Sequence, residues 1–200
     1  MNSAEGAVST STTRISDPEL TVWTIGHSVR AWPEFLSLLE AHGIRRLADV
    51  RRYPSSKRAP WSNRGALEAA LRPEGIAYEH VEDLGGFRRP RPDSANVGLR
   101  SAGFRGYADH TATPTFRTAL EGLLRRAREV RIAVMCAEAV PWRCHRSILS
   151  DALVARGALV VHILGPGQVR EHRPISMAVI RGPEITYPGR APKRLKRVRP

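Results

Sequence analysis

The sequence has few cysteines, no long apolar run and no apolar leader, and each shortage excludes a class of protein. No run approaches the roughly 18 apolar residues that a membrane-spanning helix needs, so we expect no membrane partner. The only two cysteines in 200 residues are Cys136 and Cys144, too few for the disulfide framework of a secreted domain. The first residues lack the apolar segment of a signal peptide. Together these features predict a cytoplasmic protein with free thiols.

Acidic residues are scarce beside basic ones. The sequence has 32 Lys and Arg residues against 19 Asp and Glu residues, a formal net charge of +13. Residues 189–200 hold six of the cations and no acid, which leaves +7 on the remainder of the chain. A basic surface attracts anions in a salt-sensitive way. We therefore expect an anionic small molecule or nucleic acid as partner; the charge does not indicate an oligomeric state.

Short apolar runs alternate with stretches of helical periodicity. The runs predict strands at residues 22–25, 47–50, 76–81, 132–136 and 159–164. The periodic stretches predict helices at residues 33–43, 65–72, from Thr113 onward and 142–156. Strands that alternate with helices are typical of a mostly parallel sheet with right-handed crossovers. The fold class predicted is therefore α/β, a single domain with about five strands flanked by helices.

The chain divides into four segments by composition. We expect a disordered leader at 1–20, the α/β domain at 21–165, a terminal extension at 166–188 and a basic tail at 189–200. Within the domain, residues 87–110 are rich in Gly, Pro and Arg. A loop of this length in a compact domain is usually a lid, a binding loop or a disordered segment.

Polar and small residues follow one predicted strand after another. Since parallel strands bring their carboxyl ends to one edge of a sheet, where ligands bind, these residues should gather there. The candidates are His27 and Ser28 after the first strand, Arg51 after the second, Gly85 and Gly86 after the third, and Glu138 after the fourth. His27 could act as acid or base, or as a structural hydrogen-bonding group. Asp49, inside the second strand, is expected to be satisfied by Arg51 or by a neighbouring backbone donor.

The loop after the fourth strand carries the strongest signal. Cys144, His145 and Arg146 should fall in the first turn of the next helix, where an anion binds and a thiol pKa is lowered. Cys144 is therefore a candidate nucleophile beside His145, with Glu138 orienting or sharing the proton. Arg51 and Arg146 would hold an anionic substrate. Cys136, which closes an apolar strand, is expected to be a small buried hydrophobic residue.

Two other interpretations of these residues remain open. Cys136, Cys144, His145 and a distant His27 could bind zinc, although the spacing of the cysteines matches no zinc knuckle. The same basic crevice could belong to a non-catalytic module that binds a nucleotide or nucleic acid. The sequence indicates no cofactor and does not decide whether the protein is an enzyme.

Several short motifs occur together and in order. They are Thr24-Ile-Gly-His-Ser28, Asp49-Val-Arg51, Leu84-Gly-Gly86, Tyr107-Ala, Cys136-x-Glu138 with Cys144-His-Arg146, and Val161-His-Ile163. Over about residues 21–165 the chain resembles the domain-of-unknown-function 488 (DUF488) family. The resemblance implies a compact α/β domain of bacteria and archaea with these motifs clustered, and it implies no activity. Our hypothesis is a hydrolase or transferase that acts on a phosphate-bearing substrate through Cys/His chemistry.

Overall fold

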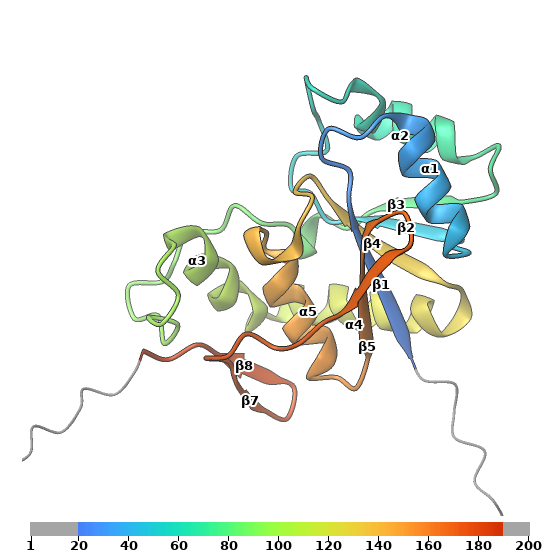
Figure 1. Ribbon diagram of the computed structural model, residues 1–200. Coiled ribbons are helices and arrows are strands. Elements are labelled where there is room, and N and C mark those ends of the chain that lie inside the picture. The colour runs from blue at the N-terminus through green and yellow to red at the C-terminus, as the bar shows by residue number, and fades with distance from the viewer. Residues whose placement is uncertain (1–19, 190–200) are drawn as a thin grey trace, which may run out of the picture.

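The computed structural model describes residues 20–189. The expected leader and basic tail therefore lie outside the described residues, except for their innermost positions. No helix within 20–189 is both long and apolar enough to cross a membrane. The α/β fold class that the sequence predicts is confirmed (Figure 1).

One sheet of six strands organises the molecule. Its strands are β1 (Thr21–Gly26), β2 (Arg46–Asp49), β3 (Ala77–His80), β4 (Ile132–Cys136), β5 (Leu159–Gly165) and β6 (Gln168–Glu171). Their order across the sheet is β3-β2-β4-β1-β5-β6, and β6 alone runs antiparallel to its neighbour. A separate hairpin is formed by β7 (Val179–Arg181) and β8 (Glu184–Thr186).

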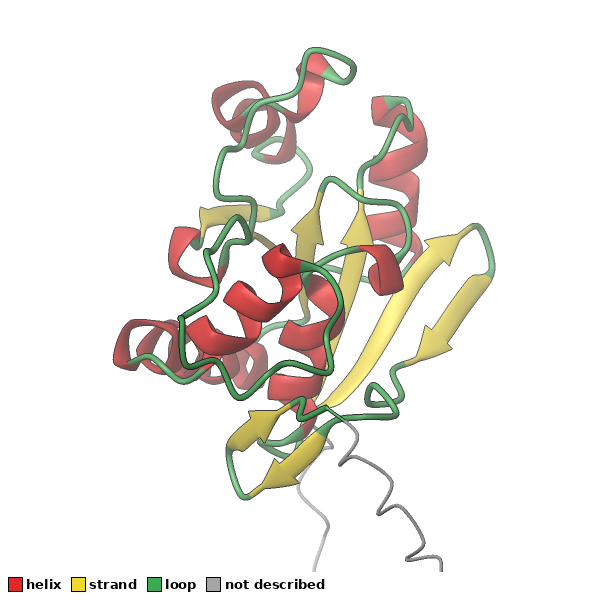
Figure 2. Ribbon diagram, turned by 90° about the vertical axis from the view of Figure 1, so that its left-hand side faces the viewer, coloured by secondary structure: helices red, strands yellow, loops and turns green. Residues whose placement is uncertain are grey.

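Helices cover both faces of the sheet, as Figures 1 and 2 show. They are α1 (Trp32–Ala41), α2 (Arg64–Leu71), α3 (Ala102–Thr111), α4 (Pro114–Glu129) and α5 (Arg146–Val154), with short 3-10 turns η1 (Pro60–Ser62), η2 (Glu82–Leu84) and η3 (Pro141–Arg143). Helices α1 and α2 share one core with the sheet. Helices α3, α4 and α5 share the other. Alternate side chains of β4 pack into the two cores. Val134 and Cys136 lie in the core with α5, and Ala133 and Met135 lie in the core with α1.

The order of the strands creates a crevice beside β4. The chain passes from β1 through α1 to β2 and leaves a vacant position, which β4 later fills by pairing with both. The connections that follow β1 and β2 cross one face of the sheet, whereas the connection that follows β4 crosses the other. Neighbouring strands whose connections diverge in this way leave a ligand site outside their carboxyl ends.

The structure corrects three local predictions. The last part of the expected 87–110 loop is helix α3, whose Gly106 has no room for a side chain because the Arg88 backbone packs against it. The helix expected from Trp142 begins only at Arg146, because Pro141 starts a 3-10 turn and Cys144 is extended, with φ −132°. Strand β6 follows Gly165 by a tight turn and was not predicted. Its residues are exposed and carry no apolar alternation.

Candidate active site

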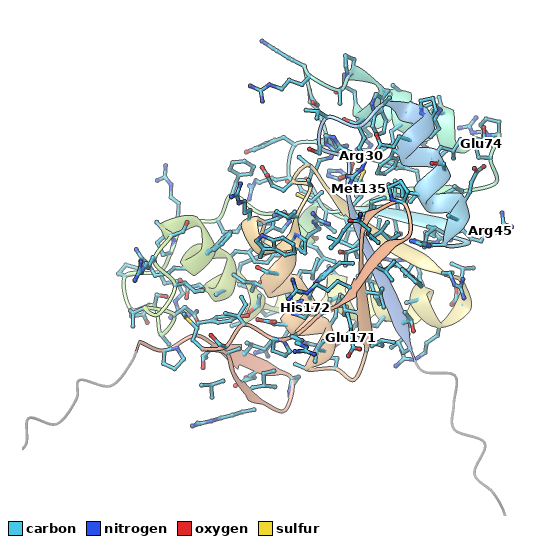
Figure 3. All side chains as sticks on the ribbon, in the orientation of Figure 1. Arg30, Arg45, Glu74, Met135, Glu171 and His172 are labelled. Carbon is cyan, nitrogen blue, oxygen red and sulfur yellow. The ribbon has the colours of Figure 1, made fainter. Side chains whose placement is uncertain are left out.

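A cavity of 510 Å³ opens at the carboxyl ends of β2 and β4. Its walls come from four segments: the loop after β2, the residues that follow η2, the start of α3 and the loop after β4. The lining side chains that carry charge, sulfur or an imidazole are Arg51, Arg52, Cys136, Glu138, Arg143, Cys144 and His145. In Figure 3, Arg30 and Met135 mark this end of the sheet, whereas His172 lies toward the opposite end.

Both cysteines contact the same imidazole nitrogen. His145 Nδ1 lies 3.6 Å from the Cys144 sulfur and 3.9 Å from the Cys136 sulfur. Both thiols are free, and the two residues are 3% and 6% exposed. The backbone N–H of Arg146 also donates to the Cys144 sulfur at 3.5 Å. The sulfur of Cys144 therefore contacts one backbone donor and the imidazole while still lining the cavity.

The His145 ring is fixed from three sides. Its Nε2 lies 3.2 Å from the carbonyl oxygen of Val50, which can only accept, so Nε2 carries a proton and Nδ1 faces the sulfurs. The Tyr107 ring packs against the imidazole with centroids 4.8 Å apart. On the third side, a methyl group at Gly86 would lie 2.9 Å from Nδ1. A residue with a side chain at this position would therefore clash with the imidazole.

The two thiols differ in acidity. A hydrogen bond from the Cys136 thiol lowers the pKa of Cys144 well below its usual value, and His145 and Arg146 lower it further against the opposing effect of burial. That hydrogen bond, together with burial, raises the pKa of Cys136 well above its usual value. Of the two thiols, Cys144 is therefore the one that ionises more readily.

The same three side chains form a possible metal site. One donor atom from each of Cys136, Cys144 and His145 falls within 4.8 Å of the others, and no other such set of three or more His, Cys, Asp or Glu residues occurs within 20–189. Two sulfurs and one imidazole nitrogen are donors that suit zinc. The bond between His145 Nε2 and the Val50 carbonyl is the outer contact usual for a metal-bound histidine. The residues present therefore fit the metal.

Arg51 and Asp49 form a buried ion pair beneath the cavity, as the sequence predicts. Asp49 is fully buried and accepts from the Arg51 guanidinium at 2.6 and 2.9 Å. It also accepts from the Tyr78 hydroxyl at 2.9 Å. Ser62 accepts two further contacts from the guanidinium. The Arg51 charge is thus already neutralised, so this side chain shapes the cavity more than it attracts an anion.

His27 lies behind Arg51 and does not line the cavity. Its Nε2 accepts from the Arg51 guanidinium at 3.2 Å, and its Nδ1 lies 2.9 Å from the Ser28 carbonyl oxygen. Burial first, and then the Arg51 charge, lower the pKa of His27 to about 4. The imidazole is therefore neutral at neutral pH, and it contacts Arg51 and the Ser28 backbone rather than the cavity. Ser28, with φ +49°, also lies outside the cavity wall.

Arg146 is buried at 1% exposure and does not line the cavity. Its guanidinium donates to the backbone carbonyl of Glu138 and, at 3.4 Å, to the Thr24 hydroxyl. It thereby fixes the loop that follows β4. Among residues 20–189 no carboxylate forms an ion pair with it.

A chain of buried hydrogen bonds links this cation to a distant acid. The Thr24 hydroxyl lies 2.7 Å from His162 Nδ1, His162 Nε2 lies 3.0 Å from His172 Nδ1, and His172 Nε2 lies 2.6 Å from Asp151. Because Asp151 accepts and Arg146 donates, every bond in the chain runs from the arginine toward the aspartate. Burial first, and then His172, lower the pKa of His162 to about 3.

Two arginines and one glutamate supply the free charge of the cavity. Arg52 and Arg143 line it, and within 20–189 no carboxylate lies at ion-pair distance from either guanidinium. The Glu138 side chain lines the opposite part of the loop wall and is exposed. The cavity therefore offers two cations and one group able to carry a proton.

The structure brings some predicted site residues together and separates others. Cys144, His145, Glu138, Arg51 and Gly86 line one cavity. The remaining four, His27, Ser28, Gly85 and Arg146, lie outside its lining. Gly85 instead packs on the backbone, where a side chain would meet Glu82 and Arg52.

Other residues line the cavity besides the predicted site residues, among them Cys136, Arg52, Tyr53, Phe87 and Arg143. Cys136 was expected to be an inert buried residue, yet its sulfur contacts the same imidazole as Cys144. Strand alternation could have indicated it, because Cys136 faces α5, the helix that follows Cys144. Tyr53 and Phe87 carried no signal beyond their position after a strand and after a glycine pair.

The model of one family, described as Domain of unknown function DUF488, matches residues 31–153. That range is more than half of the chain, so the protein belongs to this family, as its motifs indicate. Comparison with curated proteins gives no match. Comparison with solved structures gives none either. The family description assigns no activity, and the chemistry must be argued from the cavity itself.

Proposed function

We propose that the protein is an enzyme, a hydrolase or transferase, that uses Cys144 as a nucleophile on a phosphate-bearing substrate. The observation that carries the proposal is the 3.6 Å contact between the Cys144 sulfur and His145 Nδ1 on the wall of a 510 Å³ cavity. A thiolate next to a base that is itself oriented by a third group is the usual arrangement of a cysteine nucleophile. Here the Val50 carbonyl is the orienting group.

The reaction would proceed through a covalent intermediate on sulfur. Proton transfer from Cys144 to His145 leaves a thiolate, whose sulfur attacks the electrophilic carbon or phosphorus atom of the substrate. The bond to the leaving group breaks, and the imidazolium or the Glu138 carboxyl returns a proton to that group. As its oxygen attacks the intermediate, water or an acceptor hydroxyl gives its proton to the imidazole or carboxylate that protonated the leaving group. The bond to sulfur breaks, which releases the product and restores the thiolate. Water gives hydrolysis, and an acceptor gives transfer.

Arg52 and Arg143 would bind the phosphate. Both guanidinium groups line the cavity that holds the thiolate, and neither is paired with a carboxylate within 20–189. Arginine suits this task because its planar donors match phosphate oxygens in pairs. Since Arg51 is already paired with Asp49, we assign it the support of the wall and not the primary anion contact.

Turnover of a substrate panel by matched variants tests the proposal. Nucleotides and sugar phosphates are incubated with wild type, Cys144→Ser and Ser55→Ala, which changes an exposed residue of the cavity rim, and products are followed by mass spectrometry. Cys144→Ser should retain phosphate affinity and lose turnover by about a thousandfold or more, while Ser55→Ala stays near wild type. Equal turnover by Cys144→Ser and wild type would exclude Cys144 as the nucleophile.

A zinc site at Cys136, Cys144 and His145 is the second candidate. It is favoured by the 4.8 Å grouping of the three donors and by the carbonyl contact of His145. Such a site would leave a fourth position open toward the cavity, as catalytic zinc sites do. Elemental analysis of the purified protein separates the two candidates. One equivalent of zinc would make Cys144 a ligand and not a nucleophile, and a content near zero excludes this alternative.

A further inference from the structure

Two exposed aromatic rings stand together at the cavity that holds Cys144. Tyr53 comes from the loop after β2 and is 65% exposed, and Phe87 follows η2 and is 83% exposed. Their ring centroids lie 6.0 Å apart with planes at 48°, and both rings line the cavity. Large aromatic side chains exposed side by side bury no core surface, so their placement points to a ligand that covers them.

The backbone holds Phe87 in an unfavourable conformation. Its φ is +57°, one of two positive values at non-glycine residues within 20–189. A bulky residue in this region is strained, and such residues gather at ligand clamps. The turn is fixed on both sides: Arg88 donates to the Gly85 carbonyl at 3.0 Å, and Gly86 packs against His145. Phe87 therefore directly follows the glycine that packs against the imidazole of the site.

Cations lie close to the same rings. The Arg52 guanidinium is 5.9 Å from the centroid of Tyr53, and Arg143 lines the same cavity. The cavity therefore combines flat apolar faces with unpaired guanidinium groups. A ligand that uses both must carry a planar ring and a negative charge. The volume of 510 Å³ is within the range of small-molecule sites.

We propose that the substrate of this cavity is a nucleotide unit, with its base stacked on Tyr53 and Phe87 and its phosphate on Arg52 and Arg143. The inference rests on the proposed function and specifies its substrate class. Rings of this kind bind the faces of unstacked bases without requiring a particular base. The unit could be a free mononucleotide or one nucleotide of a single strand, because both present the same face and charge.

Binding measurements with and without the base test the proposal. Adenosine monophosphate, ribose 5-phosphate and a short single-stranded oligonucleotide are titrated into wild type, Tyr53→Ala, Phe87→Ala and Tyr53→Phe, by calorimetry. Each alanine variant should weaken binding of the base-bearing ligands about tenfold and leave ribose 5-phosphate unchanged. Tyr53→Phe should bind as wild type does. Saturation by the mononucleotide identifies a free nucleotide as the ligand, and binding by the oligonucleotide alone identifies a single strand.

Trp142 provides the matched control. It is 51% exposed, has the Arg170 guanidinium 5.6 Å from its ring and lines a separate cavity, so Trp142→Ala should leave nucleotide binding unchanged. The proposal is overturned if wild type binds ribose 5-phosphate as tightly as the mononucleotide, if no base-bearing ligand binds, or if Trp142→Ala weakens binding as much as the other two alanine variants.

Failure of this inference can be told apart from failure of the proposed chemistry. The rate at which iodoacetamide alkylates Cys144 reports the thiolate without any nucleotide. Tyr53→Ala should keep that rate while losing nucleotide affinity, whereas His145→Phe should lower it while the stacking remains. A low alkylation rate in wild type would count against the nucleophile and leave the base-stacking result standing.

Discussion

Acid should destabilise this protein at pH values where most proteins remain stable, because two histidines are buried in neutral form. His27 is 2% exposed and His162 is 3% exposed, so solvent screens neither. Burial is the main cause that lowers their pKa values to about 4 and about 3. In the unfolded chain both return to about 6.5. Between these limits the unfolded state binds more protons, so stability falls as the pH falls from 6.5 toward the folded pKa.

The magnitude follows from the shifts. Moving from about pH 8 to about pH 5 should remove about 2 kcal/mol for each histidine, or about 4 kcal/mol together. The assay is urea unfolding at both pH values, followed by tryptophan fluorescence. Cys144 acts in the same direction, because its thiolate also binds fewer protons when folded. The quantity to compare is therefore the pH dependence of wild type against that of His162→Gln.

His162→Gln should reduce the loss of stability between these pH values by about 2 kcal/mol, whatever its effect on stability at high pH. Val161→Ala, at the half-buried neighbouring position on β5, is the control and should keep the wild-type dependence. If His162→Gln loses as much stability on acidification as wild type does, the imidazole is not buried in neutral form and the reasoning from the hydrogen-bond chain fails.

Three further changes have expected outcomes in urea unfolding. Asp49→Ala leaves the buried Arg51 charge without its partner and should lower the unfolding free energy by about 3–5 kcal/mol; a loss below about 1 kcal/mol, the value of a surface pair, would contradict this. Gly26→Ala places a methyl group onto the carbonyl oxygen of the loop after β4 and should prevent stable folding, whereas Gly65→Ala, in open space on α2, should be neutral or stabilising. Thr113→Ala removes the side-chain cap of α4 at Phe116 N–H and should cost about 1 kcal/mol; an unchanged midpoint would show that the cap is replaced.

Elements with a local signal could be predicted from the sequence. Helix α4 begins where Thr113 and Pro114 indicate, because capping and the fixed φ of proline act within one turn. The apolar run at 132–136 is strand β4 without change. Strand β6 and the start of α5 could not be predicted in the same way. Neither has a signal in its own residues: β6 forms by pairing with β5 across a tight turn, and the 3-10 turn that Pro141 begins delays α5 until Arg146.

The candidate site was predictable in position but not in composition. Strand ends placed Cys144, His145, Arg51 and Gly86 at one edge, and these residues do line one cavity. The sequence could not show which charged side chains would form contacts inside the protein instead of facing the cavity. Arg146 was expected to bind an anion, yet its guanidinium donates hydrogen bonds to the backbone of the loop after β4 and to the Thr24 hydroxyl.

The pairing of β1 with β5 sets the boundaries of any useful fragment. The family match covers residues 31–153, but β1 precedes that range and β5 follows it, and they are hydrogen-bonded to each other along Thr21–Ile25. A fragment trimmed to the match would leave β4 as a bare edge and remove Thr24 and His162, which lie between Arg146 and Asp151. It would also lose Tyr187, a buried side chain whose hydroxyl donates to Asp151 at 2.6 Å. The unit that folds is therefore longer than the unit that defines the family, and a soluble fragment should span residues 20–189.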